Sequence, residues 1–174
     1  MRSLSLIRTE DTAGLRLFSL NVLKNQKGTA MEYRRFDRDY YIRLDKGDEV
    51  IASLIALCER EGIRCGSVSG IGGCGYAAVG VFDLAAKEYV RREEHTLLEL
   101  VSLNGNITVY EEKPYVHAHA LFAYQREGEI GTLTGHLLEA VIELTGELVL
   151  TPAEGRITRR YDEALGIRTW DFGA

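Results

Sequence analysis

The sequence lacks any apolar run close to the roughly 20 residues that a membrane-spanning helix needs. Its first 30 residues are a poor secretory signal as well, because charged residues interrupt their apolar stretch. Cysteines are few and odd in number, and their spacing fits neither a disulfide framework nor a CxxC zinc motif; they are Cys58, Cys65 and Cys74. These absences predict a cytoplasmic protein with no membrane partner and with reduced, mostly buried thiols.

An excess of basic charge is also missing. The net charge is −5, whereas a protein that binds DNA through non-specific phosphate contacts usually has a strong basic face. Local basic pairs are flanked by acidic residues, which predicts solvated surface; these pairs are Arg34/Arg35, Arg91/Arg92 and Arg159/Arg160. The charge pattern therefore does not support a DNA partner.

The chain of 174 residues fits one domain with a sizeable core. Residues 1–30 are polar and irregular, and we expect a flexible extension there, followed by a domain over 31–174. An alternative is that translation begins at Met31, which mass spectrometry of the native protein would test.

Patterns of secondary structure predict an α+β fold. Apolar residues recur at helical spacing from Val50 to Cys58, with Asp48 as the expected N-cap and Gly62 as the expected end. Nearly all the remaining signals are typical of strands, separated by a glycine-rich bend at 70–75 and an Asn104-Gly105 turn. No further long helix alternates with these strands, so we expect a mostly antiparallel sheet carrying one main helix.

Three of the four histidines form the most specific chemical pattern. His117 and His119 are two apart in a predicted strand, so their side chains leave the same face roughly 7 Å apart. A turn at 125–129 then predicts that His136 on the next strand lies opposite His119 or His117, unless Gly131 or Gly135 introduces a bulge. Three imidazoles with an open fourth position are typical of catalytic zinc sites, although nickel, iron or manganese also suit such ligands.

Other candidates are less specific. Glu99 stands in an otherwise apolar strand and could transfer protons or orient a ligand histidine, or it could be a charge at a sheet edge or interface. Asn106 could bind a substrate or close the turn before it. Cys74 has no identifiable activating base, so packing is its expected role. Gly70-x-Gly72-x-x-Gly75 matches the letters of a dinucleotide fingerprint, but a strand is expected to follow it where that motif requires a helix.

The order and spacing of several segments resemble the plants-and-prokaryotes-conserved (PPC) domain, also known as domain of unknown function 296. The segments are 46–50, 63–72, 98–107, 113–119, 134–138 and 147–151. The resemblance runs from about Tyr40 to Leu150. It implies an antiparallel sheet assembled as a homotrimer, a fold shared with acetolactate decarboxylase. That enzyme holds zinc through an HxH pair and a third histidine, and His117, His119 and His136 match those positions.

The family is often labelled DNA-binding because plant members carry a separate AT-hook built on Arg-Gly-Arg-Pro. That tetrapeptide is absent here. The plant motif Gly-Arg-Phe-Glu-Ile-Leu maps to residues 96–101 and keeps only Glu99.

Three functions are therefore compared. The first is a zinc-dependent enzyme or binder of an unknown small molecule, with Glu99 as the candidate catalytic residue. The second is a trimeric DNA-associated regulatory module. The third is a structural metal site that stabilises the trimer.

Overall fold

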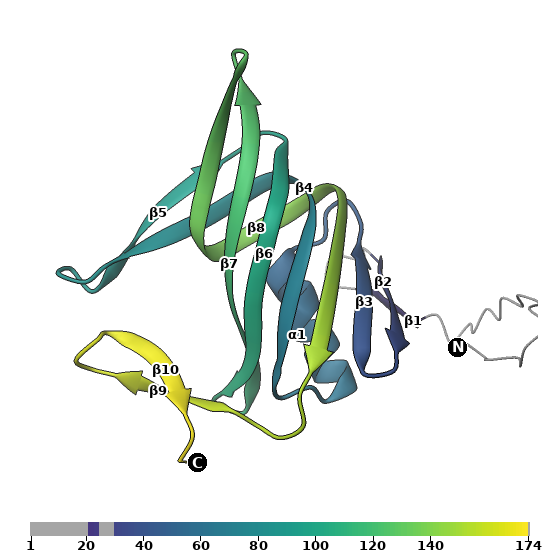
Figure 1. The fold of residues 1–174 in the computed structure, drawn as a ribbon, viewed down its shortest axis with the longest axis vertical. Helices are drawn as coiled ribbons and strands as arrows, with labels where there is room; N and C mark the ends of the chain where they lie inside the picture. The colour runs from purple at the N-terminus through teal and green to yellow at the C-terminus, as the bar shows by residue number, and fades with distance from the viewer. Residues whose placement is uncertain (1–20, 25–29, 174) are drawn as a thin grey trace, which may run out of the picture.

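The computed structural model describes residues 21–24 and 30–173 (Figure 1). The expected flexible extension over 1–30 lies outside the described residues, apart from 21–24 and Ala30. The elements in chain order are β1 (Asn21–Lys24), β2 (Ala30–Phe36), β3 (Asp39–Leu44), α1 (Val50–Glu61), β4 (Gly66–Asp83), β5 (Glu88–Glu94), β6 (Leu98–Tyr110), β7 (Lys113–Arg126), β8 (Glu129–Pro152), β9 (Thr158–Asp162) and β10 (Ile167–Asp171).

All ten described strands belong to one sheet, as predicted for an α+β chain with one main helix. The path runs β1-β2-β3-β8-β4-β6-β9-β10, while β5 pairs with β4 and β7 pairs with β6 and β8. Among these described strands every pairing is antiparallel, except for a single parallel bridge between Val109 of β6 and Thr158 of β9. With 12 residues, the one helix in the described part of the chain is too short to span a bilayer.

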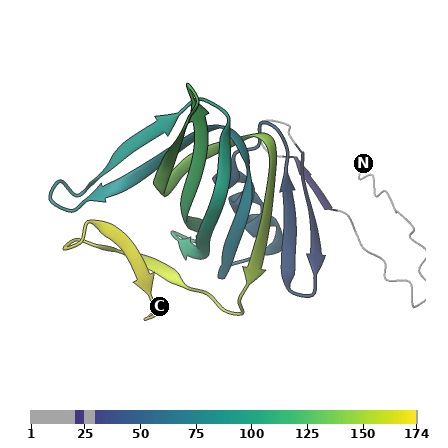
Figure 2. The ribbon, with the colours of Figure 1, turned by 45° about the horizontal axis from the view of Figure 1, so that its top comes forward.

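Helix α1 covers one face of the sheet and contributes Val50, Leu54 and Leu57 to the core (Figures 1 and 2). It begins one residue later than predicted: Glu49 is the N-cap, and its carboxylate accepts hydrogen bonds from the Ile51 and Ala52 backbone N–H groups. Asp48 is buried and instead accepts from the Asp45 backbone N–H. Gly62 ends the helix in the left-handed conformation, φ 70°, as expected.

The predicted bend at 70–75 and the turn at Asn104-Gly105 are both wrong. Both segments lie inside long strands, β4 with 18 residues and β6 with 13. A Cβ on Gly105 would lie 2.6 Å from the His117 carbonyl oxygen, and one on Gly72 would lie 2.5 Å from that of Thr145. These glycines therefore permit close packing of neighbouring strands. Because turns also favour glycine, the sequence alone does not distinguish the two cases. Consistent with the expectation for 76–82, no helix follows Gly75, so the dinucleotide fingerprint lacks its required context.

Two hairpins extend from the same side of the sheet, β4–β5 and β9–β10 (Figures 1 and 2). Their tips are joined, because Lys87 Nζ donates a hydrogen bond of 2.8 Å to the Glu163 carbonyl oxygen. Gly166 makes room for this contact, since a Cβ there would lie 3.1 Å from the Lys87 side chain. Both hairpins reach the histidines, through Tyr89 of β5 and Arg159 of β9.

Candidate metal centre

Strand β7 carries the HxH pair on the face of the sheet opposite α1. Its even-numbered residues Val116, Ala118 and Ala120 are buried in the core, so alternation places His117 and His119 on the other face. His117 is half-buried and His119 is exposed. The pair therefore lies on a surface that a ligand can reach.

The third histidine lies where hairpin register predicted it. His119 pairs with His136, and the register continues without a bulge to Arg126 and Glu129. The ring centroids are 5.3 Å apart for His117 and His119, 4.9 Å for His117 and His136, and 5.5 Å for His119 and His136. One potential ligand atom from each ring lies within 4.8 Å of the other two.

The cluster fits a zinc ion by donor type and by spacing. Tetrahedral zinc with Zn–N bonds of about 2.0–2.1 Å places its nitrogens about 3.4 Å apart. Small side-chain rotations would bring the three ligand nitrogens to that spacing. The Nδ1 atom of His136 is buried and has no hydrogen-bond partner in the described structure. A buried nitrogen without a partner is costly, and a bound metal is one way to satisfy the ring.

Burial and the charges of neighbouring groups favour the neutral forms of His117 and His136. Desolvation, followed by the charges of His117, His119 and Arg159, lowers the pKa of His136 to about 4. Desolvation, then Arg159 and His119, also lowers the pKa of His117. Because only a neutral imidazole can bind a metal, these environments keep ligands available below the usual histidine pKa.

The low pKa of His136 predicts that the metal-free protein loses stability as pH falls from about 6.5 to about 4. The unfolded chain takes up a proton near pH 6.5 and the folded chain only near 4, so protonation favours unfolding in that window. We expect a loss of about 1–2 kcal/mol, discounted from the full shift because the ring is partly exposed. Thermal unfolding with chelator at pH 4.5 and 7 measures it. His136→Gln should flatten the dependence, and an equal loss in both proteins would contradict the prediction.

Tyr89 from β5 covers His136. The two rings stack with centroids 5.0 Å apart and planes 29° apart. Gly80 of β4 makes this possible, because a Cβ there would lie 2.8 Å from the Tyr89 ring. Tyr89 therefore fixes one side of His136 and limits how its ring can rotate.

Arg159 of β9 approaches the cluster from the second hairpin. Only 8% of the residue is exposed, so the predicted surface position of the Arg159/Arg160 pair is wrong for its first member. Its Nη2 donates to Asn106 Oδ1 at 2.8 Å and lies 3.4 Å from His117 Nδ1. Adjacent residues of a strand face opposite ways, which explains why Arg160 is exposed and Arg159 is not.

Asn106 lies opposite His117 in the β6–β7 pairing, so it faces the site instead of closing a turn. Glu99 is paired with Ala123, four residues along β7 from His119, which is roughly 13 Å at strand spacing. It is exposed and lines a separate hollow with Ile71 and Leu144. Within one chain the structure therefore brings Asn106, and not Glu99, to the histidines.

Cys74 is buried in the core, where desolvation and then Glu49 raise its pKa to about 12. A thiol with such a pKa is protonated at neutral pH, as expected for a packing role.

Both the sequence and the fold match known proteins. Residues 31–154 match the family model of the Plants and Prokaryotes Conserved (PCC) domain. The chain belongs to this family. The match begins at β2 and ends after β8, so it contains all three histidines, whereas Arg159 lies beyond it.

Solved structures agree with this assignment. A protein from Bacteroides thetaiotaomicron, described as a putative DNA-binding protein, is 30% identical, with a TM-score of 0.76 over 83% of this chain and 99% of that one. A metal-containing protein from Archaeoglobus fulgidus is 29% identical, with a TM-score of 0.68 over 90% and 99%. A plant- and prokaryote-conserved protein from Pyrococcus horikoshii is 26% identical, with a TM-score of 0.68 over 91% and 96%. The comparison with curated proteins gave no match.

Proposed function

We propose that this PCC-domain chain holds a zinc ion with His117, His119 and His136 and binds or converts a small molecule beside it. The observation that carries the proposal is the convergence of three imidazole ligand atoms within 4.8 Å on an accessible face of the sheet. The metal-containing relative from Archaeoglobus supports it. The test is the zinc content of the purified protein compared with that of histidine variants.

The chain's own residues prepare this site in distinct ways. When bound, zinc would supply a Lewis acid with one position open to a ligand. Tyr89 restrains the His136 ring by stacking, and Arg159 contacts His117. The β4–β5 and β9–β10 hairpins carry these two residues and are joined at their tips by the Lys87–Glu163 hydrogen bond (Figure 2).

Proton transfer by Glu99 is proposed only for an assembly of several copies of the chain. At roughly 13 Å along the strand, its carboxylate cannot exchange a proton with a ligand at the histidines of its own chain. It acts there only if a neighbouring copy of the chain brings its own Glu99 to the site. Glu99→Gln should accordingly leave zinc content unchanged.

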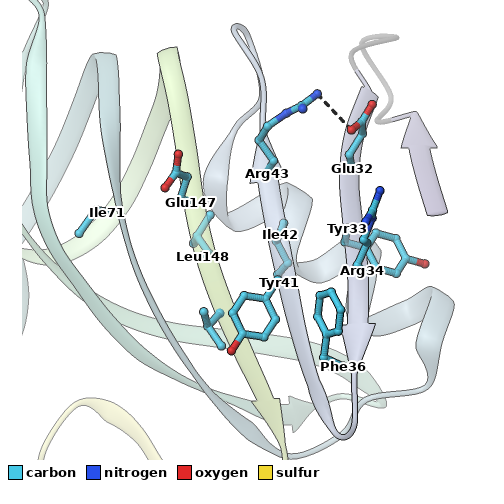
Figure 3. Close-up of a pocket in the computed structure, with 11 residues that line it drawn as sticks. Glu32, Tyr33, Arg34, Phe36, Tyr41, Ile42, Arg43, Ile71, Glu147 and Leu148 are labelled. Atoms are coloured by element: carbon cyan, nitrogen blue, oxygen red, sulfur yellow. Dashed lines mark ion pairs between the residues drawn. The ribbon is translucent and has the colours of Figure 1, made fainter. Parts of the chain in front are cut away.

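The homotrimer is also proposed, and the outer face of the sheet supports it. Five apolar side chains there are 40–58% exposed and form what we call the outer apolar surface: Phe36, Tyr41, Ile71, Val101 and Leu144. Phe36, Tyr41 and Ile71 line a hollow of about 630 Å³, with the Glu32–Arg43 ion pair at its rim (Figure 3). An apolar centre with a charged rim is the composition of a subunit interface.

Ile71→Glu tests the assembly, because it places a charge in the outer apolar surface. We expect the wild type to have a mass of roughly three times 19.5 kDa, and the variant to dissociate. Light scattering coupled to size exclusion measures both. Ile130→Glu is the matched control, since Ile130 is 81% exposed next to the β7–β8 turn. A monomeric wild type, or a variant that still assembles, would contradict the proposal.

A DNA-associated regulatory module is the second candidate, favoured by the description of the Bacteroides relative. The described surface gives it little support, because several exposed arginines already pair with acids: Arg43 with Glu32, Arg91 with Glu93, and Arg126 with Glu94. Binding of an AT-rich duplex that weakens as salt increases would favour this function, and no binding at about 50 mM salt would exclude it.

A structural metal site is the third candidate. In that case chelation would lower the melting temperature and dissociate the trimer, with no ligand bound at the open position. We also propose a cytoplasmic location, which the three unpaired and buried cysteines support.

A further inference from the structure

Arg159 is a buried cation for which the described residues supply no acidic partner. Its Nε donates to Thr108 Oγ1 at 2.8 Å, and its Nη1 donates to the Arg168 carbonyl oxygen at 2.9 Å. Its Nη2 donates to Asn106 Oδ1, and the Tyr115 ring lies 4.7 Å from the guanidinium carbon. All these groups are neutral, and no carboxylate of the described residues forms an ion pair with it. Burying a charge without a counter-charge is costly, so such a group calls for an explanation.

The sequence offers many acidic residues, but none of those in the described part of the chain forms an ion pair or hydrogen bond with Arg159. The described side chains that contact it or the histidine cluster are neutral: Asn106, Thr108, Tyr89 and Tyr115, besides the histidines themselves. A divalent ion on the histidines would add two further positive charges to the same region. A ligand that brings negative charge is therefore strongly favoured there.

Metal binding also releases a hydrogen-bond donor of Arg159. A guanidinium only donates, so its contact with His117 uses the lone pair of Nδ1. A metal takes one ring nitrogen of a neutral imidazole: either Nδ1 itself, or Nε2 with the ring proton then on Nδ1. In both cases Nδ1 no longer accepts from Arg159, and one Nη2 N–H is left to bind a ligand.

Asn106 completes the recognition site. Its Oδ1 faces Arg159, which directs its amide Nδ2 away from the guanidinium as a further donor. One planar guanidinium, one amide and one open metal position match a single carboxylate better than a phosphate, whose greater charge needs more donors.

We propose that Arg159 and Asn106 form a carboxylate-binding subsite beside the three histidines, so that the ligand of this centre is a small organic monocarboxylate. The proposal deepens the proposed function and rests on it for the nearby metal. It assigns a positioning role to β9, which lies outside the stretch matched by the family model.

The test is a ligand-observed NMR titration with acetate, glycolate and pyruvate, each compared with its neutral amide, on zinc-loaded and metal-free protein. We expect at least one acid to bind the wild type, with its amide more than 10-fold weaker. Arg159→Met should weaken binding of that acid more than 10-fold. Arg160→Met, the exposed neighbour on the same strand, should bind as the wild type does.

Asn106→Asp is a second variant that separates loss of acid binding from loss of folding. It places a carboxylate next to the guanidinium, so it should block acid binding while raising the melting temperature by about 2–4 °C. Full acid binding by Arg159→Met or Asn106→Asp, equal binding of amides, or Arg159-dependent binding of inorganic phosphate in preference to the acids would overturn the proposal. So would a zinc-loaded wild type that binds none of the acids.

Failure of the metal proposal gives a different result. A wild type that holds no zinc would remove the proposed metal function. Acid binding that is lost in Arg159→Met would still support the subsite, because that binding is measured on metal-free protein as well.

Discussion

Replacing His117 and His119 together by alanine is expected to abolish zinc binding. The wild type should hold close to one zinc per chain after loading, and the variant less than about one tenth of that, because only His136 would remain of three ligands. Plasma mass spectrometry of the untagged, dialysed protein measures the content directly.

The fourth histidine supplies the matched control. His95 lies outside the cluster, where it contacts Tyr76 and Glu93, and 71% of its side chain is exposed. His95→Ala should keep the full zinc content. Zinc that survives in the double variant, or a wild type that stays empty after loading, would exclude the three-histidine site.

Gly72→Val is expected to produce the largest loss of stability, about 3 kcal/mol or more. Its Cβ would lie 2.5 Å from the Thr145 carbonyl oxygen and 3.0 Å from the Gly146 Cα, both backbone atoms of β8. Strand β4 cannot move away, because it is hydrogen-bonded to β8 on one side and β6 on the other.

Urea unfolding followed by circular dichroism measures this loss. Gly173→Val is the control, since the nearest atom to a Cβ there is 3.5 Å away. Gly72→Ala serves if the valine variant is insoluble, and its loss should be smaller but still well above that of the control. Equal stability of the Gly72 and Gly173 variants would show that β4 and β8 can separate without cost.

The histidine centre could be predicted from sequence because it depends on short-range geometry. Alternation along one strand puts His117 and His119 on one face, and a single two-strand hairpin sets the position of His136. The helix was predictable for the same reason, since its apolar stripe and Gly62 are local signals. The N-cap was misplaced by one residue because Asp48 and Glu49 both offer a capping carboxylate.

Features that depend on distant parts of the chain could not be predicted. The burial of Arg159 arises from one parallel bridge between Val109 and Thr158, 49 residues apart in the numbering, and no local pattern encodes it. Glu99 is conspicuous in the sequence as a carboxylate in an otherwise apolar strand, but that pattern gives no distance to the histidines. Gly105 was read as a turn because the sequence does not show which strands lie on either side of it.

The two parts of the proposed ligand site come from separate segments of the chain. The histidines lie within the matched residues 31–154, whereas the Arg159 guanidinium is carried by a hairpin that starts at Thr158. Exchanging residues 158–171 of this chain would therefore alter the acid-binding part of the proposed site and leave the three histidines in place.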